Sequence, residues 1–219
     1  MKKAILFGSS GFIGSFLLQE LLNDANYEQV TIVVRRQPGI SHPKLKVLMG
    51  DYHSLPNLEQ DIIADEVFIT LGTTKKNTPR QDEYYQADHD YPVLAATIAR
   101  QNGASSIFIV TAVGANANSN IFYIKTKGET ERDIIALKFN HTHIFRPSMI
   151  MGTRKEKRPL EKIFIKLWSV INPVLAGGLS KYKGITGASI AKAMISAARL
   201  QSQKLKIYHW EEMMGLLDK

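Results

Sequence analysis

The chain of 219 residues contains no cysteine. This absence excludes disulfides, zinc–thiolate sites, iron–sulfur clusters and cysteine nucleophiles, and it fits a reducing compartment, so we expect a cytoplasmic protein. No run of the sequence reaches the roughly 18–20 apolar residues that cross a bilayer, so we expect no stable membrane insertion. Internal repeats and low-complexity segments are also missing, which favours a globular protein with a substantial core.

The sequence lacks a strong concentration of one charge. It carries 28 Lys and Arg against 20 Asp and Glu, a net charge of +8, but the basic residues are dispersed apart from the segment 153–162. Basic and aromatic residues are not interleaved as in nucleic-acid-binding modules, so we expect no nucleic-acid partner. The charge suits a solvated basic face or a polyanionic small molecule.

Apolar runs of strand length are frequent, with helical segments between them. Such an alternation predicts an α/β fold in which a doubly wound parallel sheet is covered by helices on both faces. The strand-like runs cover 3–7, 30–34, 44–49, 66–71, 106–110 and 142–145, and the helical segments cover 91–102, 122–139 and a stretch from about Phe12.

The regular alternation of strand-like and helical segments ends after about residue 150. Residues 1–150 are predicted to form the main domain, and residues 151–219 a small helical lobe that packs on it as part of one compact unit. In this lobe we expect helices at 159–176 and 187–201, a strand at 204–210 and a short final helix. The first of these helices is apolar around much of its circumference, which is typical of core packing.

Three glycines, Gly8, Gly11 and Gly14, lie where the first strand passes into the first helix. Each costs about 0.5–1 kcal/mol relative to alanine in a regular element. In a dinucleotide site Gly8 allows the tight turn, Gly11 lets the backbone approach the pyrophosphate, and Gly14 lets the helix pack closely on the strand. A glycine turn without a ligand is the alternative, and the placement favours the dinucleotide.

Residues at the ends of the next strands indicate which dinucleotide is bound. An NAD site places Asp or Glu after the second strand, whereas this chain has Arg35 and Arg36, which suit the 2′-phosphate of NADP(H). We therefore expect NADP(H), with NAD(H) as the second candidate and surface arginines as the alternative interpretation. Asp51 follows the third strand, where its carboxylate could accept a hydrogen bond from the adenine amino group.

Tyr123 and Lys127 form the only Tyr-x-x-x-Lys spacing in the sequence. Four residues apart at the start of a helix, they share one face. Reduction of a carbonyl needs a proton donor, and a nearby ammonium lowers the pKa of a phenol towards the neutral range. The pair therefore indicates acid–base chemistry, although a half-buried tyrosine beside a solvated lysine gives the same spacing.

Taken in order, five segments resemble the Tat-interacting-protein family of atypical short-chain dehydrogenases/reductases, which are NADPH-binding Rossmann proteins. The similarity runs from the N-terminus to about residue 155. The segments are the glycine turn, "LGTTKK" (71–76), "ADHDYPVLAA" (87–96), "FYIKTKGETE" (122–131) and "IFRPSMIMG" (144–152).

This resemblance implies a role for each matching residue. The helix start in "DHDYP" would pack near the cofactor, and adjacent side chains in Asp88-His89-Asp90 do not converge on a metal ion, so we expect none. The implied ligands are Gly8, Ser10, Gly11, Phe12 and Ile13 for the pyrophosphate, Arg35 and Arg36 for the 2′-phosphate, Leu71, Gly72 and Thr73 for the adenosine side, Tyr123 and Lys127 for catalysis, and Pro147 and Ser148 for the nicotinamide.

The chain departs from the family pattern after the fifth strand. Short-chain dehydrogenases usually carry a serine there that donates a hydrogen bond to the substrate carbonyl, whereas this chain reads Thr111-Ala112-Val113-Gly114. Only Thr111 keeps a hydroxyl and is the candidate donor. Loss of such a donor costs on the order of 100-fold in rate.

Three functions compete on this basis. The first is an NADPH-dependent reductase of a small carbonyl or quinone-like molecule, with a pocket lined from the C-terminal lobe. The second is a non-catalytic NADP(H)-binding regulator with a protein partner, which the Thr111-Ala112 departure and the basic segment 153–162 favour. The third is a nucleotide-sugar epimerase, which needs a larger C-terminal domain. The sequence carries no signal of an oligomeric state. The candidate pocket residues are Phe164, Leu167, Trp168 and Tyr182.

Overall fold

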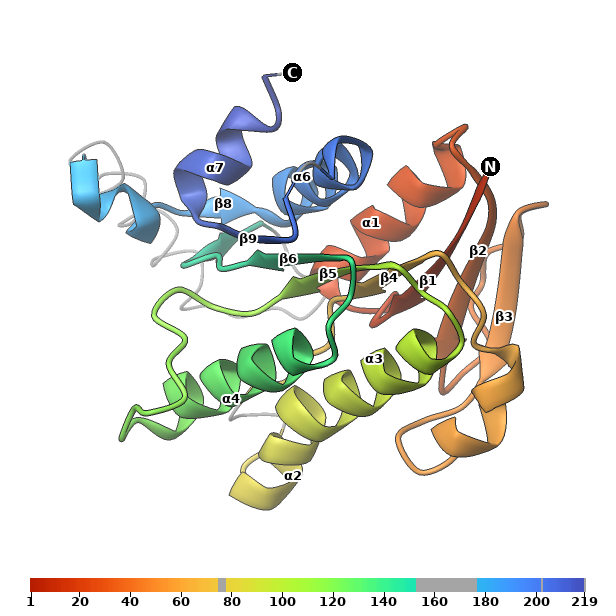
Figure 1. Cartoon of the computed structure of the whole chain (residues 1–219), viewed down its shortest axis with the longest axis horizontal. Helices are drawn as coiled ribbons and strands as arrows, with labels where there is room; N and C mark the ends of the chain where they lie inside the picture. The colour runs from red at the N-terminus through yellow and green to blue at the C-terminus, as the bar shows by residue number, and fades with distance from the viewer. Residues whose placement is uncertain (75–77, 153–176, 202, 219) are drawn as a thin grey trace.

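The computed structural model describes residues 1–74, 78–152, 177–201 and 203–218. Its main feature is a seven-stranded sheet in the order β3-β2-β1-β4-β5-β6-β9, in which every neighbouring pair is parallel (Figure 1). The predicted doubly wound sheet is confirmed. Its strands are β1 (Lys2–Phe7), β2 (Tyr27–Val34), β3 (Leu45–Met49), β4 (Glu66–Ile69), β5 (Ser106–Val110), β6 (His141–Phe145) and β9 (Leu205–Tyr208).

Helices cover both faces of this sheet (Figure 1). Alternate residues of β1 divide between two buried clusters: Ala4 and Leu6 pack towards α1 and α6, whereas Ile5 and Phe7 pack towards α3 and α4. This division follows from the two-residue period of a strand. The main helices are α1 (Phe12–Asn23), α3 (Tyr91–Gln101), α4 (Phe122–Ala136), α6 (Gly187–Leu200) and α7 (Trp210–Gly215).

Short elements complete the described part of the fold. A second, two-stranded parallel sheet pairs β7 with β8. Within the described residues no helix is long and apolar enough to cross a membrane. The short elements are the 3₁₀ helices η1 (Leu55–Asp61) and η4 (Gly177–Tyr182), the helix α2 (Gln81–Tyr85), the π-helix η2 (Gln86–Asp90), and the strands β7 (Ile150–Met151) and β8 (Ile185–Thr186).

The strand order of the sheet has a switch point between the neighbouring strands β1 and β4. From β1 the chain moves outward to β2 and β3, then returns to β4 on the other side of β1 and continues to β9. In a doubly wound sheet the crevice at the carboxyl ends of the strands at this switch point is the usual ligand site. The glycine turn lies at this position.

The C-terminal region is joined to the main sheet. β9 pairs in parallel with β6, with Ile144 opposite Ile207, and α6 contributes Ile190 and Met194 to the cluster on the α1 face. The predicted strand 204–210 corresponds to β9, which covers the shorter range Leu205–Tyr208. The boundary near residue 150 stays a prediction, and the predicted helix 159–176 lies outside the described residues.

The predicted helix 91–102 is confirmed as α3 (Tyr91–Gln101), and the unpredicted α2 and η2 run directly into its start. Pro92, which the pattern places in a first turn, lacks an N–H group and cannot donate to the carbonyl of Asp88. The hydroxyl of Thr130 on α4 donates to that carbonyl instead, at 2.9 Å. A tertiary contact thus satisfies the carbonyl that the proline leaves open.

Candidate functional site

The turn between β1 and α1 has room only for glycine at two positions. Gly8 has a φ of +92°, and a Cβ there would lie 2.8 Å from the backbone of Thr70 on the neighbouring segment. A Cβ on Gly14 would lie 2.1 Å from the carbonyl oxygen of Gly8. The roles predicted for these two glycines, a tight turn and close helix–strand packing, are confirmed.

The N-terminus of α1 opens into the same crevice. Its N-cap residue is Gly11, no side chain caps the helix, and no acidic residue lies in its first turn. The positive end of the helix dipole attracts an anion, so the turn fits a pyrophosphate. Ser10 is exposed beside it.

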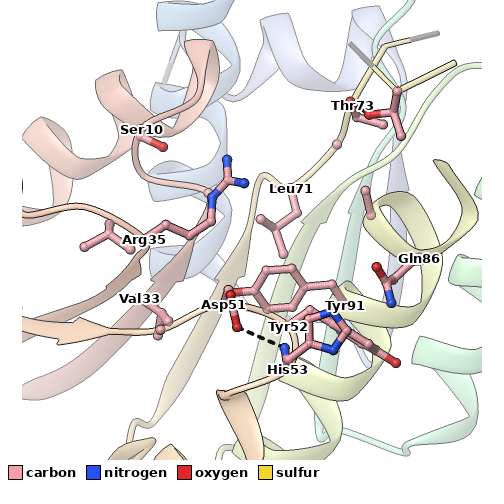
Figure 2. A pocket seen from close by; sticks show the side chains of 16 residues that line it. Ser10, Val33, Arg35, Asp51, Tyr52, His53, Leu71, Thr73, Gln86 and Tyr91 are labelled. Carbon is pink, nitrogen blue, oxygen red and sulfur yellow. Dashed lines mark hydrogen bonds between the residues drawn. The ribbon is translucent and has the colours of Figure 1, made fainter. Parts of the chain in front are cut away.

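A cavity of about 550 Å³ lies on one side of this turn, and we name it the outer chamber (Figure 2). Arg35 projects into it from the end of β2, and Asp51, Tyr52 and Tyr91 lie together in its wall (Figure 2). Its lining residues are Gly8, Ser10, Val33, Val34, Arg35, Gly50, Asp51, Tyr52, His53, Leu71, Gly72, Thr73, Thr78, Gln86, Ala87 and Tyr91.

Of two residues expected at the adenosine end, Asp51 lines the outer chamber and Arg36 does not. Arg36 is exposed and lines neither this chamber nor the next one, as alternation along a strand end would give. The Asp51 carboxylate accepts hydrogen bonds from the amides of His53 (3.1 Å) and Ser54 (3.0 Å) and from the Ser54 hydroxyl. These bonds, those from Ser54 first, hold the pKa of Asp51 below its usual value.

A smaller cavity of about 190 Å³, the inner chamber, adjoins the outer one across a shared wall of Leu71, Gly72 and Thr73. It brings together residues from six separate segments. Its lining residues are Gly11, Phe12, Ile13, Thr70, Leu71, Gly72, Thr73, Thr74, Asp88, Val110, Thr111, Tyr123, Lys127 and Ile150.

Tyr123 and Lys127 line the inner chamber from α4, as the four-residue spacing predicts. Lys127 is buried, and its Nζ atom lies 3.2 Å from Asp88 Oδ2. Partial burial of the Tyr123 side chain, which is 43% exposed, and secondarily the negative charge of Asp88 raise its pKa to about 12. The expected lowering of this pKa by Lys127 is therefore wrong, because the ammonium is paired with a carboxylate.

Thr111 also lines the inner chamber, but its hydroxyl has a buried acceptor. It donates to Glu131 Oε1 at 2.6 Å, and Glu131 in turn accepts two hydrogen bonds from the guanidinium of Arg146. The backbone amide of Thr111 donates to the carbonyl of Phe145 at 2.8 Å. The hydroxyl expected to meet a substrate is thus directed into a buried ion pair.

The remaining expected site residues lie apart from the two chambers. Pro147 is buried and accepts a hydrogen bond from the Val113 amide at 3.0 Å, and Ser148 is half-buried; neither lines a chamber. Tyr182 is 39% exposed and lines neither chamber. The other expected pocket residues, Phe164, Leu167 and Trp168, and the basic segment 153–162 lie outside the described residues.

Three features of the site were not expected from the sequence. Asp88 was noticed only as part of "DHDYP", whose helical position gave no sign of its pairing with Lys127. Tyr52 and Tyr91 line the outer chamber with ring centroids 6.0 Å apart. Their signals in the sequence are an aromatic residue after a strand and another at a helix start.

In the part of the chain that the structure describes, no cluster of three or more histidine or acidic side chains could hold a metal ion.

Comparison with known proteins agrees with this geometry. Residues 8–163 match a family described as NAD(P)H-binding. The mitochondrial protein FMP52 of Candida glabrata is 30% identical over 203 residues, which cover 92% of this chain and 87% of the relative. Protein HTATIP2 of Rattus norvegicus is 26% identical over 199 residues, which cover 89% and 80%. HTATIP2 bears out the resemblance to the Tat-interacting-protein family.

Solved structures agree with the fold. The UDP-N-acetylglucosamine 4-epimerase from Methanobrevibacter ruminantium M1, in complex with UDP-N-acetylmuramic acid, superposes with a TM-score of 0.70 at 19% identity. The match covers 95% of this chain and 76% of the epimerase. At this identity the likeness concerns the fold alone.

One expectation is corrected by these relatives. The absence of cysteine led us to expect a cytoplasmic protein, but the FMP52 relatives are named as mitochondrial proteins. Absence of thiols fits more than one compartment, so it was a weak guide to location.

Proposed function

The chain belongs to the NAD(P)H-binding family as an atypical short-chain dehydrogenase/reductase, and from this premise we propose that it is an NADPH-dependent reductase of a small carbonyl or quinone-like substrate. One observation carries the proposal. Tyr123 and Lys127 line a chamber whose wall includes Gly11 of the glycine turn, and this chamber adjoins the one that Arg35 enters.

The described residues fit a dinucleotide laid across both chambers. The turn at Gly8 and Gly11 would hold the pyrophosphate, because it combines backbone amides, a helix N-terminus and space that a Cβ would fill. The guanidinium of Arg35 would pair with a 2′-phosphate, which favours NADPH over NADH. Tyr52 and Tyr91 offer aromatic surface beside the adenine position.

The reaction needs one hydride and one proton. A bound reduced nicotinamide supplies the hydride to the carbonyl carbon. The phenol of Tyr123 donates its proton to the carbonyl oxygen as the C=O electron pair moves onto that oxygen, and a proton from solvent then restores the phenol. The balanced reaction consumes one NADPH, one proton and one carbonyl, and yields NADP⁺ and an alcohol. Lys127, on the same face of α4, would orient Tyr123 and the bound cofactor in the inner chamber.

A second candidate function is a non-catalytic NADP(H)-binding regulator that signals the state of the cofactor to a protein partner. The hydrogen bond from Thr111 to Glu131 favours it, because this bond engages the one hydroxyl that could replace the usual serine. The sugar-nucleotide epimerase alternative has support only from the fold.

Two measurements test the proposal. NADPH and NADH are titrated separately by calorimetry, and NADPH oxidation is followed over a panel of aldehydes, ketones and quinones. We expect tighter binding of NADPH and turnover that Tyr123→Phe abolishes while cofactor affinity stays. Tyr85→Phe is the matched control, because Tyr85 lines neither chamber. Tight NADPH binding without turnover would favour the regulator, and absence of binding by either cofactor would refute both.

A further inference from the structure

Asp88 is a buried carboxylate beside the proposed acid–base pair. Its side chain is 1% exposed, although it lines the inner chamber. Burial of an ionised carboxylate costs several kcal/mol unless charges and hydrogen bonds compensate. Its compensating partners therefore indicate what the residue does.

These partners come from two different walls of the chamber. Asp88 Oδ1 accepts a hydrogen bond from the amide of Thr73 at 2.6 Å, and Oδ2 lies 3.2 Å from the ammonium of Lys127. Its backbone carbonyl accepts the hydroxyl of Thr130, also on α4. A Cβ on Gly72 would lie 3.4 Å from Asp88 Oδ1 and 3.6 Å from Lys127 Nζ. Asp88 thus ties the 72–73 segment to the helix that carries Tyr123.

We propose that Asp88 is a positioning residue that holds Lys127 in the chamber wall and sets Tyr123 as a proton donor rather than a proton acceptor. The inference rests on the proposed function. A carboxylate that neutralises the ammonium removes the charge that would stabilise a phenolate. Reduction needs a phenol that can donate its proton, and the pairing of Lys127 with Asp88 keeps Tyr123 in that form.

The charges around Tyr123 agree with this role. In the described residues, the titratable side chains facing it are Asp88 from η2, Tyr84 from α2, and Lys127 from its own helix. Partial burial first and the charge of Asp88 second raise the pKa of Tyr123 to about 12.

The experiment follows the ionisation of Tyr123 in protein that carries ¹³Cζ-labelled tyrosine. The Tyr123 signal is assigned by its loss in Tyr123→Phe. We expect wild-type Tyr123 to stay largely protonated at about pH 10.5, where an ordinary tyrosine is mostly ionised. In Asp88→Asn the midpoint should fall by at least about one pH unit, because the ammonium of Lys127 is then unopposed. Asp88→Glu, which keeps the charge, should leave Tyr123 protonated at this pH.

The matched control is Asp133→Asn, which removes a carboxylate of α4 that pairs with His89 and lies outside the inner chamber. It should leave the Tyr123 midpoint unchanged. The inference is overturned if folded Asp88→Asn keeps the wild-type midpoint, or if wild-type Tyr123 ionises near pH 10. The wild-type titration and Asp88→Glu decide the matter if Asp88→Asn does not fold. Failure of the proposed function would appear separately, as absent NADPH binding and turnover in the wild type.

Discussion

Two buried carboxylates, one at each end of the parallel sheet, show how differently the same chemical group is used. Asp88 at the carboxyl end and Glu66 at the amino end both have side chains that are 1% exposed. Glu66 accepts from the ammonium of Lys2 at 2.5 Å, from the Tyr27 hydroxyl and from the Gln201 amide. These donors join β1, β2, β4 and the residue after α6.

The partners of Asp88 have a different arrangement. They include a backbone amide of the 72–73 segment, the side chain of Tyr84 on α2, and Lys127, which lines the inner chamber. Both clusters meet the cost of burial, but the donors of Glu66 tie strands together, whereas the ammonium beside Asp88 borders the proposed reaction space. The comparison predicts that changes at the amino end alter stability alone, and that changes at the carboxyl end alter binding and protonation.

The largest expected effect on stability comes from Glu66→Ala. It leaves the buried Tyr27 hydroxyl without its acceptor and removes one of the two acceptors of the Gln201 side-chain amide, and we expect a loss of about 3 kcal/mol in the free energy of unfolding, measured by urea denaturation. NADPH affinity should change less than about twofold, since the cluster lies at the opposite end of the strands.

The control for Glu66 is Asp61→Ala, which breaks an ion pair with Lys46 in which both side chains are about half exposed. Such a pair contributes less than about 1 kcal/mol. Equal stability of the two variants, or a large loss of NADPH affinity in Glu66→Ala, would contradict the division of roles between the two ends.

The next effect concerns acid stability. His143 on β6 is 1% exposed, and its Nδ1 atom lies 2.8 Å from the Tyr208 hydroxyl on β9. Burial, and secondarily the charge of His141, lower the pKa of His143 to about 4. The unfolded chain therefore binds this proton below about pH 6.5 while the folded protein does not, and stability falls as the pH drops from 6.5 towards 4.

We expect this histidine to account for about 2–3 kcal/mol of the stability lost between pH 7 and pH 4. The measurement is the pH dependence of urea unfolding in wild type and in His143→Phe, whose ring can stack on Phe108 as the imidazole does. The variant should lose less stability on acidification. Parallel pH profiles for the two proteins would show that His143 does not carry the effect.

Local geometry explains which parts of the site could be predicted from the sequence. The glycine turn is set by contacts between Gly8, Gly14 and their close neighbours, and the common face of Tyr123 and Lys127 follows from helical spacing. The position of Arg35 in the chamber wall follows from its place directly after β2, but the pattern does not separate it from Arg36.

Long-range pairing explains what could not be predicted. The ammonium of Lys127 meets Asp88, and the hydroxyl of Thr111 meets Glu131, only because α2, η2 and α4 pack on one face of the sheet. Neither contact leaves a periodic signal. The charge that adds to the raised pKa of Tyr123 therefore comes from a residue whose partner the sequence does not identify.

A smaller effect tests the outer chamber. Arg35→Ala should weaken NADPH binding about tenfold, because it removes a charge-assisted pair with the 2′-phosphate, and it should leave NADH binding and stability unchanged. Arg36→Ala is the matched control, since Arg36 lines neither chamber, and it should change NADPH affinity less than about twofold. Calorimetric titration of both cofactors measures the difference. Equal losses of NADPH affinity in the two variants would contradict the assignment of Arg35 as the residue that binds the 2′-phosphate.

The smallest expected effect comes from Thr111→Val, which keeps the shape of the side chain and removes its hydroxyl. If this hydroxyl donated to the substrate, turnover would fall on the order of 100-fold. Its hydrogen bond to Glu131 instead predicts a change in kcat of less than about threefold, and a loss of about 1 kcal/mol in stability, because Glu131 keeps both bonds to Arg146. Steady-state kinetics with the best substrate of the panel, together with urea denaturation, separate the two outcomes. A large fall in kcat at unchanged stability would mean that the hydroxyl leaves Glu131 when substrate binds, and that the carboxyl end of the sheet rearranges where the amino end does not.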